Sequence, residues 1–313
     1  MPQHITLVVR RAIPDGPGTR RLVLQDPDGW PLPRWKSGAH LDLHVPRIGH
    51  RSYNMCGDTA RADTWEIAVK RETTSRGGSA WVHDVLNEGD VVAAFMPRCT
   101  FPIAEGATRH VMIAGGIGVT PFLAMAYDFE RRGAEWALHV LSRGEPPCVT
   151  ALAGWAHTGR IRIYDTTTVA RPSWDELLGG PAPALHAYCC GPQAMLEGFE
   201  NATATWPAET TSIEHFVPPT LPAAEGAKPY RLRRSTTGAE MEVEPGTSML
   251  AALWELGAHV DSSCEGGICG ACEVRWLEGE PMHRDRVLSP ERRRTHLIAC
   301  VAQCASERLV VEA

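Results

Sequence analysis

The stretch Cys264-Glu265-Gly266-Gly267-Ile268-Cys269-Gly270-Ala271-Cys272 decides how the last third of this chain folds. It places three cysteines at C-x4-C-x2-C, and Cys300 follows well downstream. This is the spacing of plant-type [2Fe–2S] ligands, in which one loop supplies three thiolates and a distant segment supplies the fourth. The glycines let backbone amides approach the cluster sulfides without a Cβ in the way. The stretch therefore predicts a [2Fe–2S] site held by Cys264, Cys269, Cys272 and Cys300.

A structural zinc site is the alternative interpretation of these cysteines. Zinc sites usually pair a C-x2-C with a second close pair of ligands. Here the four-residue gap, the glycines and the single distant Cys300 all favour iron–sulfur. Cys304 is a spare thiol four residues after Cys300, and we take Cys300 as the ligand.

The length, net charge and cysteine count limit the kinds of protein that this sequence can be. A length of 313 residues suggests two or three domains. The net charge of −6 gives no reason to expect nucleic acid or an anionic membrane surface as a partner. No apolar run is long enough to span a bilayer, and residues 1–11 do not read as a signal peptide. The six cysteines outside the predicted cluster form no disulfide framework, so we expect a cytoplasmic protein.

The first third of the chain is rich in short strand patterns. Residues 5–10, 21–24 and 41–45 alternate between apolar and polar side chains, and Pro and Gly punctuate the gaps. This pattern predicts a β-barrel or sandwich. Two motifs fall here: 51–56, which begins Arg51-Ser52-Tyr53-Asn54, and 67–71, followed by Ser75-Arg76-Gly77-Gly78-Ser79. A Gly-Gly-Ser at a helix start offers amides and a hydroxyl to a phosphate. Taken singly, each motif is more often an ordinary strand or turn.

The middle third alternates strands with helices. Strand patterns occupy 111–114, 137–141, 161–164 and 185–189, with helical patterns near 174–178 and 193–199. This alternation predicts an open parallel sheet, which binds ligands at the carboxyl ends of its strands. The run Gly115-Gly116-Ile117-Gly118-Val119-Thr120-Pro121 follows the first strand, and we expect Thr120 to be an N-cap and Pro121 the first helical residue.

The last third begins after a proline-rich linker. A closing strand is expected near 211–216, and the linker carries four prolines between 217 and 229. The sequence then predicts a hairpin around Thr237-Gly238, an amphipathic helix at 248–256 that ends near a glycine, and the cysteine loop.

These motifs, taken together and in this order, resemble the phthalate dioxygenase reductase type of oxidoreductase, a family that includes the vanillate demethylase reductases. The resemblance implies that Tyr53 lies against a flavin, that Arg51 binds its phosphate, and that Asn54 donates to flavin N5, where the family has serine. It implies FMN as the flavin in this domain order. The flavin-binding residues that it indicates are Arg51, Ser52, Tyr53, Asn54, Ala68, Lys70, Arg76, Gly77, Gly78 and Ser79.

The same resemblance covers the nucleotide loop and the segment Cys189-Cys190-Gly191-Pro192. It implies that Cys190 lies beside the nicotinamide and Phe216 near the flavin edge, although both residue types are common in protein cores. Arg143 either binds a 2′-phosphate or faces solvent. We expect NADH, with NADPH possible. The nucleotide-binding residues indicated are Gly115, Gly116, Gly118, Thr120, Pro121, Arg143, Cys190, Gly191 and Pro192.

The predicted architecture is multidomain: a β-barrel flavin domain (1–104), an α/β nucleotide domain (105–217), a linker (218–229) and a β-grasp plant-type ferredoxin domain (230–313). NADH delivers two electrons and the cluster accepts one, so a flavin belongs between them. We take Tyr53, Asn54, Cys190 and Phe216 as the catalytic residues of a reductase whose partner is a Rieske non-haem iron oxygenase of aromatic or amine degradation. The alternatives are a reductase for a cytochrome P450 and a non-catalytic electron carrier or redox sensor.

Overall fold

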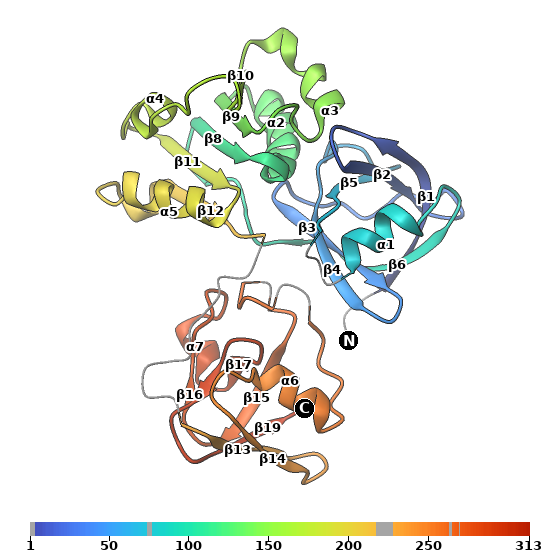
Figure 1. The fold of residues 1–313 in the computed structure, drawn as a ribbon, viewed down its shortest axis with the longest axis vertical. Coiled ribbons are helices and arrows are strands. Elements are labelled where there is room, and N and C mark those ends of the chain that lie inside the picture. Colours follow the sequence, from blue (N-terminus) through green and yellow to red (C-terminus); the bar gives the residue numbers. More distant parts are fainter. Residues whose placement is uncertain (1–3, 74–76, 217–227, 263–264, 269) are drawn as a thin grey trace. The chain divides into compact units, whose positions relative to one another are not determined.

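The computed structural model describes residues 4–73, 77–216, 228–262, 265–268 and 270–313. The chain divides into two compact units, Met1–Phe216 and Val217–Ala313, and Figure 1 shows each as a separate body of sheet and helix. The first unit contains two sheets and the second unit one principal sheet.

The N-terminal sheet of the first unit is antiparallel and nearly closed. Its strands are β1 (His4–Pro14), β2 (Thr19–Gln25), β3 (Ala39–Val45), β4 (Gly49–Asn54), β5 (Trp65–Lys70), β6 (Val91–Phe95) and β7 (Arg98–Cys99), with helix α1 (Gly78–Asp84) after β5. The order is β4-β3-β6-β1-β2-β5, and a bridge between Met55 and Ile67 brings the two ends together. Alternate side chains turn inward to a core that includes Leu22, Leu41 and Trp65. The sheet is the predicted near-barrel.

The second sheet of this unit is parallel, in the order β10-β9-β8-β11-β12. Its strands are β8 (Arg109–Gly115), β9 (Glu135–Ser142), β10 (Ile161–Asp165), β11 (Leu185–Cys190) and β12 (Thr211–Glu214). Its helices are α2 (Thr120–Arg132), α3 (Val149–Gly154), α4 (Trp174–Leu178) and α5 (Gln193–Ala202), with 3-10 turns at Gly116–Val119, Ala156–Thr158 and Ala208–Thr210.

Helices cover both faces of this parallel sheet (Figure 1). Along β8, Met112 packs with the residues of α2, whereas its neighbour Ile113 packs with those of α4 and α5. Successive side chains of a strand point to opposite faces of the sheet. The continuous apolar run of β8 therefore contributes side chains to two hydrophobic cores, one on each face.

The two sheets of the first unit are joined by buried polar contacts. The carboxylate of Asp15, which is fully buried, accepts from the amide of Thr150 at 2.7 Å and pairs with Arg21 at 2.8 Å. The carbonyl of Asp15 accepts from the amide of Cys148 at 2.7 Å. The buried carboxylate of Asp15 thus has two hydrogen-bonding partners, and a buried charge paired in this way is costly to break. Together with the backbone contact of Cys148, these interactions hold the antiparallel sheet against the parallel sheet.

The second unit has a mixed sheet in the order β14-β13-β19-β15-β17, with a separate two-stranded pair of β16 and β18. The strands are β13 (Tyr230–Arg234), β14 (Glu240–Val243), β15 (Glu273–Glu278), β16 (Pro281–Met282), β17 (His296–Ile298), β18 (Gln303–Cys304) and β19 (Arg308–Glu312). Helix α6 (Met249–Glu255) packs its apolar face on this sheet, and α7 (Pro290–Arg293) precedes β17. This is the β-grasp arrangement that the family resemblance implies.

The helix start after the glycine run differs from the prediction. Thr120 is not an N-cap: the 3-10 turn Gly116–Val119 continues directly into α2, so Thr120 is already helical. Its hydroxyl donates to the carbonyl of Ile117 at 3.0 Å instead of accepting from an amide. Pro121 is therefore the second helical residue and not the first, although it still lies in the first turn of α2. The sequence patterns also left out β6, β7, α3 and α7, and the strands β16 to β19 of the second unit, because these elements are short or lack a clear period.

Candidate functional site

The first half of the site lies where β4 meets the start of α1. A Cβ added to Gly78 would lie 2.6 Å from Cγ of Arg51 and 3.1 Å from the hydroxyl oxygen of Tyr53. Only glycine allows this approach, and Gly77, at φ 90°, turns the chain into the helix. Burial raises the pKa of Tyr53 to about 12, opposed by the charge of Arg51, so the phenol stays neutral. Arg51, Tyr53, Gly77 and Gly78 are therefore neighbours, as the resemblance requires.

The other predicted flavin residues are placed in different ways. Ser79 accepts from the amide of Glu72 at 3.1 Å, and its hydroxyl hydrogen can still donate. Ser52 donates to Asp42, the buried carboxylate that also pairs with Arg98. Strand alternation puts Ser52 on the opposite face of β4 from Arg51 and Tyr53. In β5, Ala68 is buried and Lys70 is exposed. Arg76 lies outside the described residues.

A buried polar triad connects the two sheets. Nδ2 of Asn54, at the end of β4, donates to Oε2 of Glu214 at 2.5 Å, and Sγ of Cys190 lies 3.9 Å from the same oxygen. Glu214 ends β12 and Cys190 ends β11, so the parallel sheet brings them to one edge. All three side chains are buried. The amide that the resemblance assigns to flavin N5 thus also binds a carboxyl group, and its nitrogen carries a second hydrogen.

Burial changes the charge state of this triad. It raises the pKa of Glu214 to about 8, while hydrogen bonds from Asn54 and Cys190 oppose the shift. Burial and the neighbouring Glu214 raise the pKa of the Cys190 thiol. Near neutral pH the triad therefore consists of a protonated carboxyl, a thiol and an amide, with no net charge.

Glu214 is the functional candidate that sequence reasoning missed. The sequence did contain a signal for it. Glu214 is a charged residue at the end of an otherwise uncharged strand, and it lies two residues before Phe216. Phe216 itself is 39% exposed, which does not fit a core residue.

The glycine run packs against the turn after β11. A Cβ on Gly118 would lie 2.2 Å from the carbonyl oxygen of Cys190, and one on Gly115 would lie 2.5 Å from Cδ of Pro192. A Cβ on Gly191 would lie 3.0 Å from Cα of Gly115. Gly116 has φ of 54°. These close approaches hold the carboxyl ends of β8 and β11 together, where a parallel sheet binds nucleotides. Arg143 is exposed just after β9.

The second unit brings two of the predicted cluster cysteines together. The amide of Cys300 donates to Sγ of Cys272 at 3.4 Å, and the amide of Ala299 donates to the carbonyl of Cys272 at 3.0 Å. Cys264 and Cys269 lie outside the described residues. Cys304 is buried, and its thiol donates to the carbonyl of Ser306 at 3.1 Å. The backbone of Cys300 thus lies against the thiol of Cys272, and soft sulfur ligands of this kind suit an iron–sulfur cluster.

Comparisons with known proteins decide the family. Residues 233–305 match the 2Fe-2S iron-sulfur cluster binding domain. Over 297 residues the chain is 35% identical to phthalate dioxygenase reductase of Burkholderia cepacia, covering 92% of this chain and 91% of that protein. The chain belongs to the phthalate dioxygenase reductase family. The solved structure of phthalate dioxygenase reductase, described as a modular structure for electron transfer from pyridine nucleotides to [2Fe–2S], matches with TM-score 0.76 and 32% identity. The match covers 99% of this chain and 98% of that one.

One further structural match has a different organisation. An intact type IV self-sufficient cytochrome P450 monooxygenase matches with TM-score 0.84 and 30% identity over 99% of this chain, but this covers only 41% of that chain.

Membership of the phthalate dioxygenase reductase family makes this chain an NAD(P)H-dependent oxidoreductase with FMN, NADH and [2Fe–2S] as cofactors. Its residues fit these groups. Arg51 and Tyr53 lie against Gly78 at the start of α1, and the backbone amide of Cys300 donates to the thiol of Cys272, as the flavin and cluster sites require. No helix within the described ranges has the length and apolar character needed to cross a membrane.

The glycine contacts of the nucleotide loop give a direct prediction. We expect Gly118→Ala to destabilise the protein by about 1–3 kcal/mol and to raise the KM for NADH, because the new methyl group overlaps the carbonyl of Cys190. Thermal unfolding and steady-state kinetics measure both effects. Gly154→Ala is the matched control, since no atom lies within 4 Å of its added Cβ. Equal behaviour of the two variants would contradict this account of the loop.

Proposed function

We propose that this chain transfers electrons from NADH through FMN to its [2Fe–2S] cluster and from there to a terminal oxygenase of the Rieske non-haem iron type, acting on aromatic or amine compounds in the cytoplasm. The phthalate dioxygenase reductase family supports an oxygenase as the partner. The Rieske type, the substrate class and the compartment are the parts that we add. The cytoplasm is favoured by the cysteines outside the predicted ligand set, which form no disulfide framework in the sequence.

The observation that carries the proposal is the triad of Asn54, Glu214 and Cys190. It joins the end of the flavin-domain strand β4 to the nucleotide edge of the parallel sheet. The two cofactor domains therefore share one buried polar junction, and they do so within a single compact unit. Fixed geometry of this kind suits transfer between two bound cofactors, where positioning supplies most of the catalysis.

The residues of the chain have separable roles in this proposal. Arg51 and the start of α1 bind and orient the flavin, with Tyr53 against its ring. The close contacts of Gly115 and Gly118 position the nicotinamide end of the nucleotide beside Cys190. Glu214 holds a proton next to Asn54 and keeps the junction uncharged. FMN held by these residues would supply the change from two-electron oxidation of NADH to single-electron transfer.

The visible spectrum of the purified protein, recorded before and after anaerobic addition of NADH, tests this function. We expect flavin bands and broad iron–sulfur absorption, both bleached by NADH. Iron–sulfur absorption without flavin, unchanged by NADH after FMN is added, would refute the reductase and leave a carrier or sensor.

A cytochrome P450 partner is the second candidate, because almost the whole chain aligns with one part of a self-sufficient P450 monooxygenase. NADH-reduced protein mixed anaerobically with a purified Rieske oxygenase component, or with a ferric bacterial P450, separates the two. Faster reduction of the P450 would overturn the Rieske assignment.

A further inference from the structure

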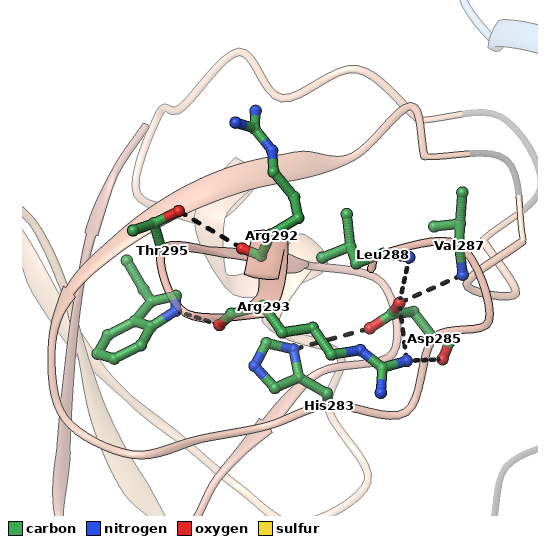
Figure 2. Close-up of polar contacts among 8 residues, drawn as sticks. His283, Asp285, Val287, Leu288, Arg292, Arg293 and Thr295 are labelled. Atoms are coloured by element: carbon green, nitrogen blue, oxygen red, sulfur yellow. Dashed lines mark hydrogen bonds and ion pairs between the residues drawn. The ribbon is translucent and has the colours of Figure 1, made fainter. Parts of the chain in front are cut away.

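A buried carboxylate in the second unit, Asp285, holds a loop in place. This loop lies outside the strands of the sheet and contains none of the predicted cluster ligands. Figure 2 shows Asp285 at the centre of this network. Oδ2 of Asp285 accepts from the amides of Val287 at 3.3 Å and Leu288 at 2.9 Å. Nη2 of Arg293 donates to the carbonyl of Asp285 at 2.6 Å and to Oδ2 at 3.3 Å. The Asp285 side chain is 1% exposed. A buried, charge-assisted network of this kind is rigid.

The fixed loop lies directly on the cysteine loop. The amide of Arg286 donates to the carbonyl of Gly267 at 3.0 Å. A Cβ on Gly267 would lie 3.2 Å from Cα of Asp285, and one on Gly270 would lie 3.7 Å from Cγ2 of Val287. Val287 nevertheless remains 39% exposed, and Arg286 is exposed beside it. An apolar side chain is therefore held at the surface next to the cluster ligands.

The surroundings of Val287 are strongly basic. Between 284 and 294 there are five arginines and two acidic residues. The rest of 228–313 carries eleven acidic and six basic residues, so the positive charge of this unit is concentrated in one segment. Arg286, Arg292 and Arg294 are exposed. In Figure 2 the guanidinium of Arg292 points away from the Asp285 network, and it pairs with Glu273, the residue after Cys272.

We propose that Val287 and the arginines 284, 286, 292 and 294, together the arginine face, form the surface on which the electron acceptor docks, and that the acceptor presents an acidic patch. This proposal rests on the proposed function, in which electrons leave from the cluster. A small apolar centre with a charged rim suits a transient electron-transfer contact. The acidic remainder of the unit repels such a partner, so the arginine face steers it to the cluster.

The test measures reoxidation of the reduced protein by two haem acceptors of opposite charge. Native cytochrome c is cationic, and succinylated cytochrome c is anionic. The double variant Arg286→Glu with Arg294→Glu reverses charge on the arginine face. We expect it to lower the second-order rate with succinylated cytochrome c by about tenfold or more, and to raise the rate with native cytochrome c. The rate of cluster bleaching by NADH should not change.

The matched control reverses charge at the other end of the sheet. Arg231 and Arg308 are exposed, and their Cα atoms are register partners. A Cβ on Gly279, just beyond β15, would lie 2.3 Å from the carbonyl oxygen of Arg308, whereas Cys272 precedes the opposite end of β15. Arg231→Glu with Arg308→Glu gives the same change in net charge, and we expect the rate with succinylated cytochrome c to change less than twofold, within the spread of exposed surface substitutions.

Three results overturn the proposal. An equal loss of rate in the two double variants would mean that net charge, not the arginine face, governs docking. No loss in either variant would mean that the acceptor docks elsewhere. Slower bleaching by NADH, with unchanged output, would assign the arginine face to the flavin domain. If NADH does not reduce the protein, the proposed function fails. The docking surface can still be tested in that case, because dithionite reduces the cluster directly.

Discussion

Cys272→Ser is expected to abolish electron output while electron input survives. Cys272 lies against Cys300 in the second unit, whereas the flavin and nucleotide residues belong to the first unit. A serine hydroxyl is a poor ligand for soft iron–sulfur chemistry. We expect loss of the iron–sulfur absorption, retained reduction of ferricyanide by NADH through FMN, and a loss of at least about a hundredfold in reduction of a protein acceptor, since second-shell changes alone cost 10–100-fold. Anaerobic spectra and steady-state assays measure all three.

Cys304→Ser is the matched control for this prediction. Cys304 is a buried cysteine of the same unit, and its thiol is engaged with the carbonyl of Ser306. We expect the cluster to survive in this variant, at a modest cost in stability. A Cys304→Ser protein without a cluster, beside a Cys272→Ser protein that retains one, would show that the ligand set was assigned to the wrong cysteine.

The cysteine spacing predicted a [2Fe–2S] site because cluster ligation imposes a strict geometry on a short segment, and the fold around it was implied by the family resemblance. Likewise, the glycines near 78 and 118 are readable from sequence, since close backbone approach admits no other residue. The family resemblance that these motifs carry implied the architecture and the cofactors, and the comparisons confirm them. The domain boundaries and the roles of individual site residues stay predictions.

Other features depend on contacts that no local pattern encodes. Glu214 and Asn54 are separated by 160 residues, and only the packing of β12 against the end of β4 makes them a pair. The Asp285 network is similar, because an Asp-x-Val sequence does not reveal that Arg293 folds back onto it. Thr120 failed as an N-cap because the 3-10 turn before it is invisible to a rule that reads helix starts from residue type.

Glu214→Gln is expected to remove a pH dependence from both stability and flavin reduction. The pKa of Glu214 in the folded protein, about 8, lies above its ordinary value of 4.5. Between these values the native state keeps a proton that the unfolded state releases. Stability from this group is therefore full below 4.5 and is lost progressively as pH rises toward 8. Each pH unit in this window costs about 1.4 kcal/mol. Glutamine keeps the neutral amide contact with Asn54 and avoids this loss.

The functional consequence follows from the same proton. Above a pH of about 8, wild-type Glu214 is a buried carboxylate within 2.5 Å of Asn54, so negative charge enters the junction where we place electron transfer. We expect the rate of flavin bleaching by NADH to fall as pH rises through this value in the wild type, and to be flat in Glu214→Gln. Glu200→Gln, an exposed carboxylate on α5, is the charge-matched control and should behave as wild type. A pH transition that persists in Glu214→Gln would place the responsible proton on another group, and the triad would then be a structural contact alone.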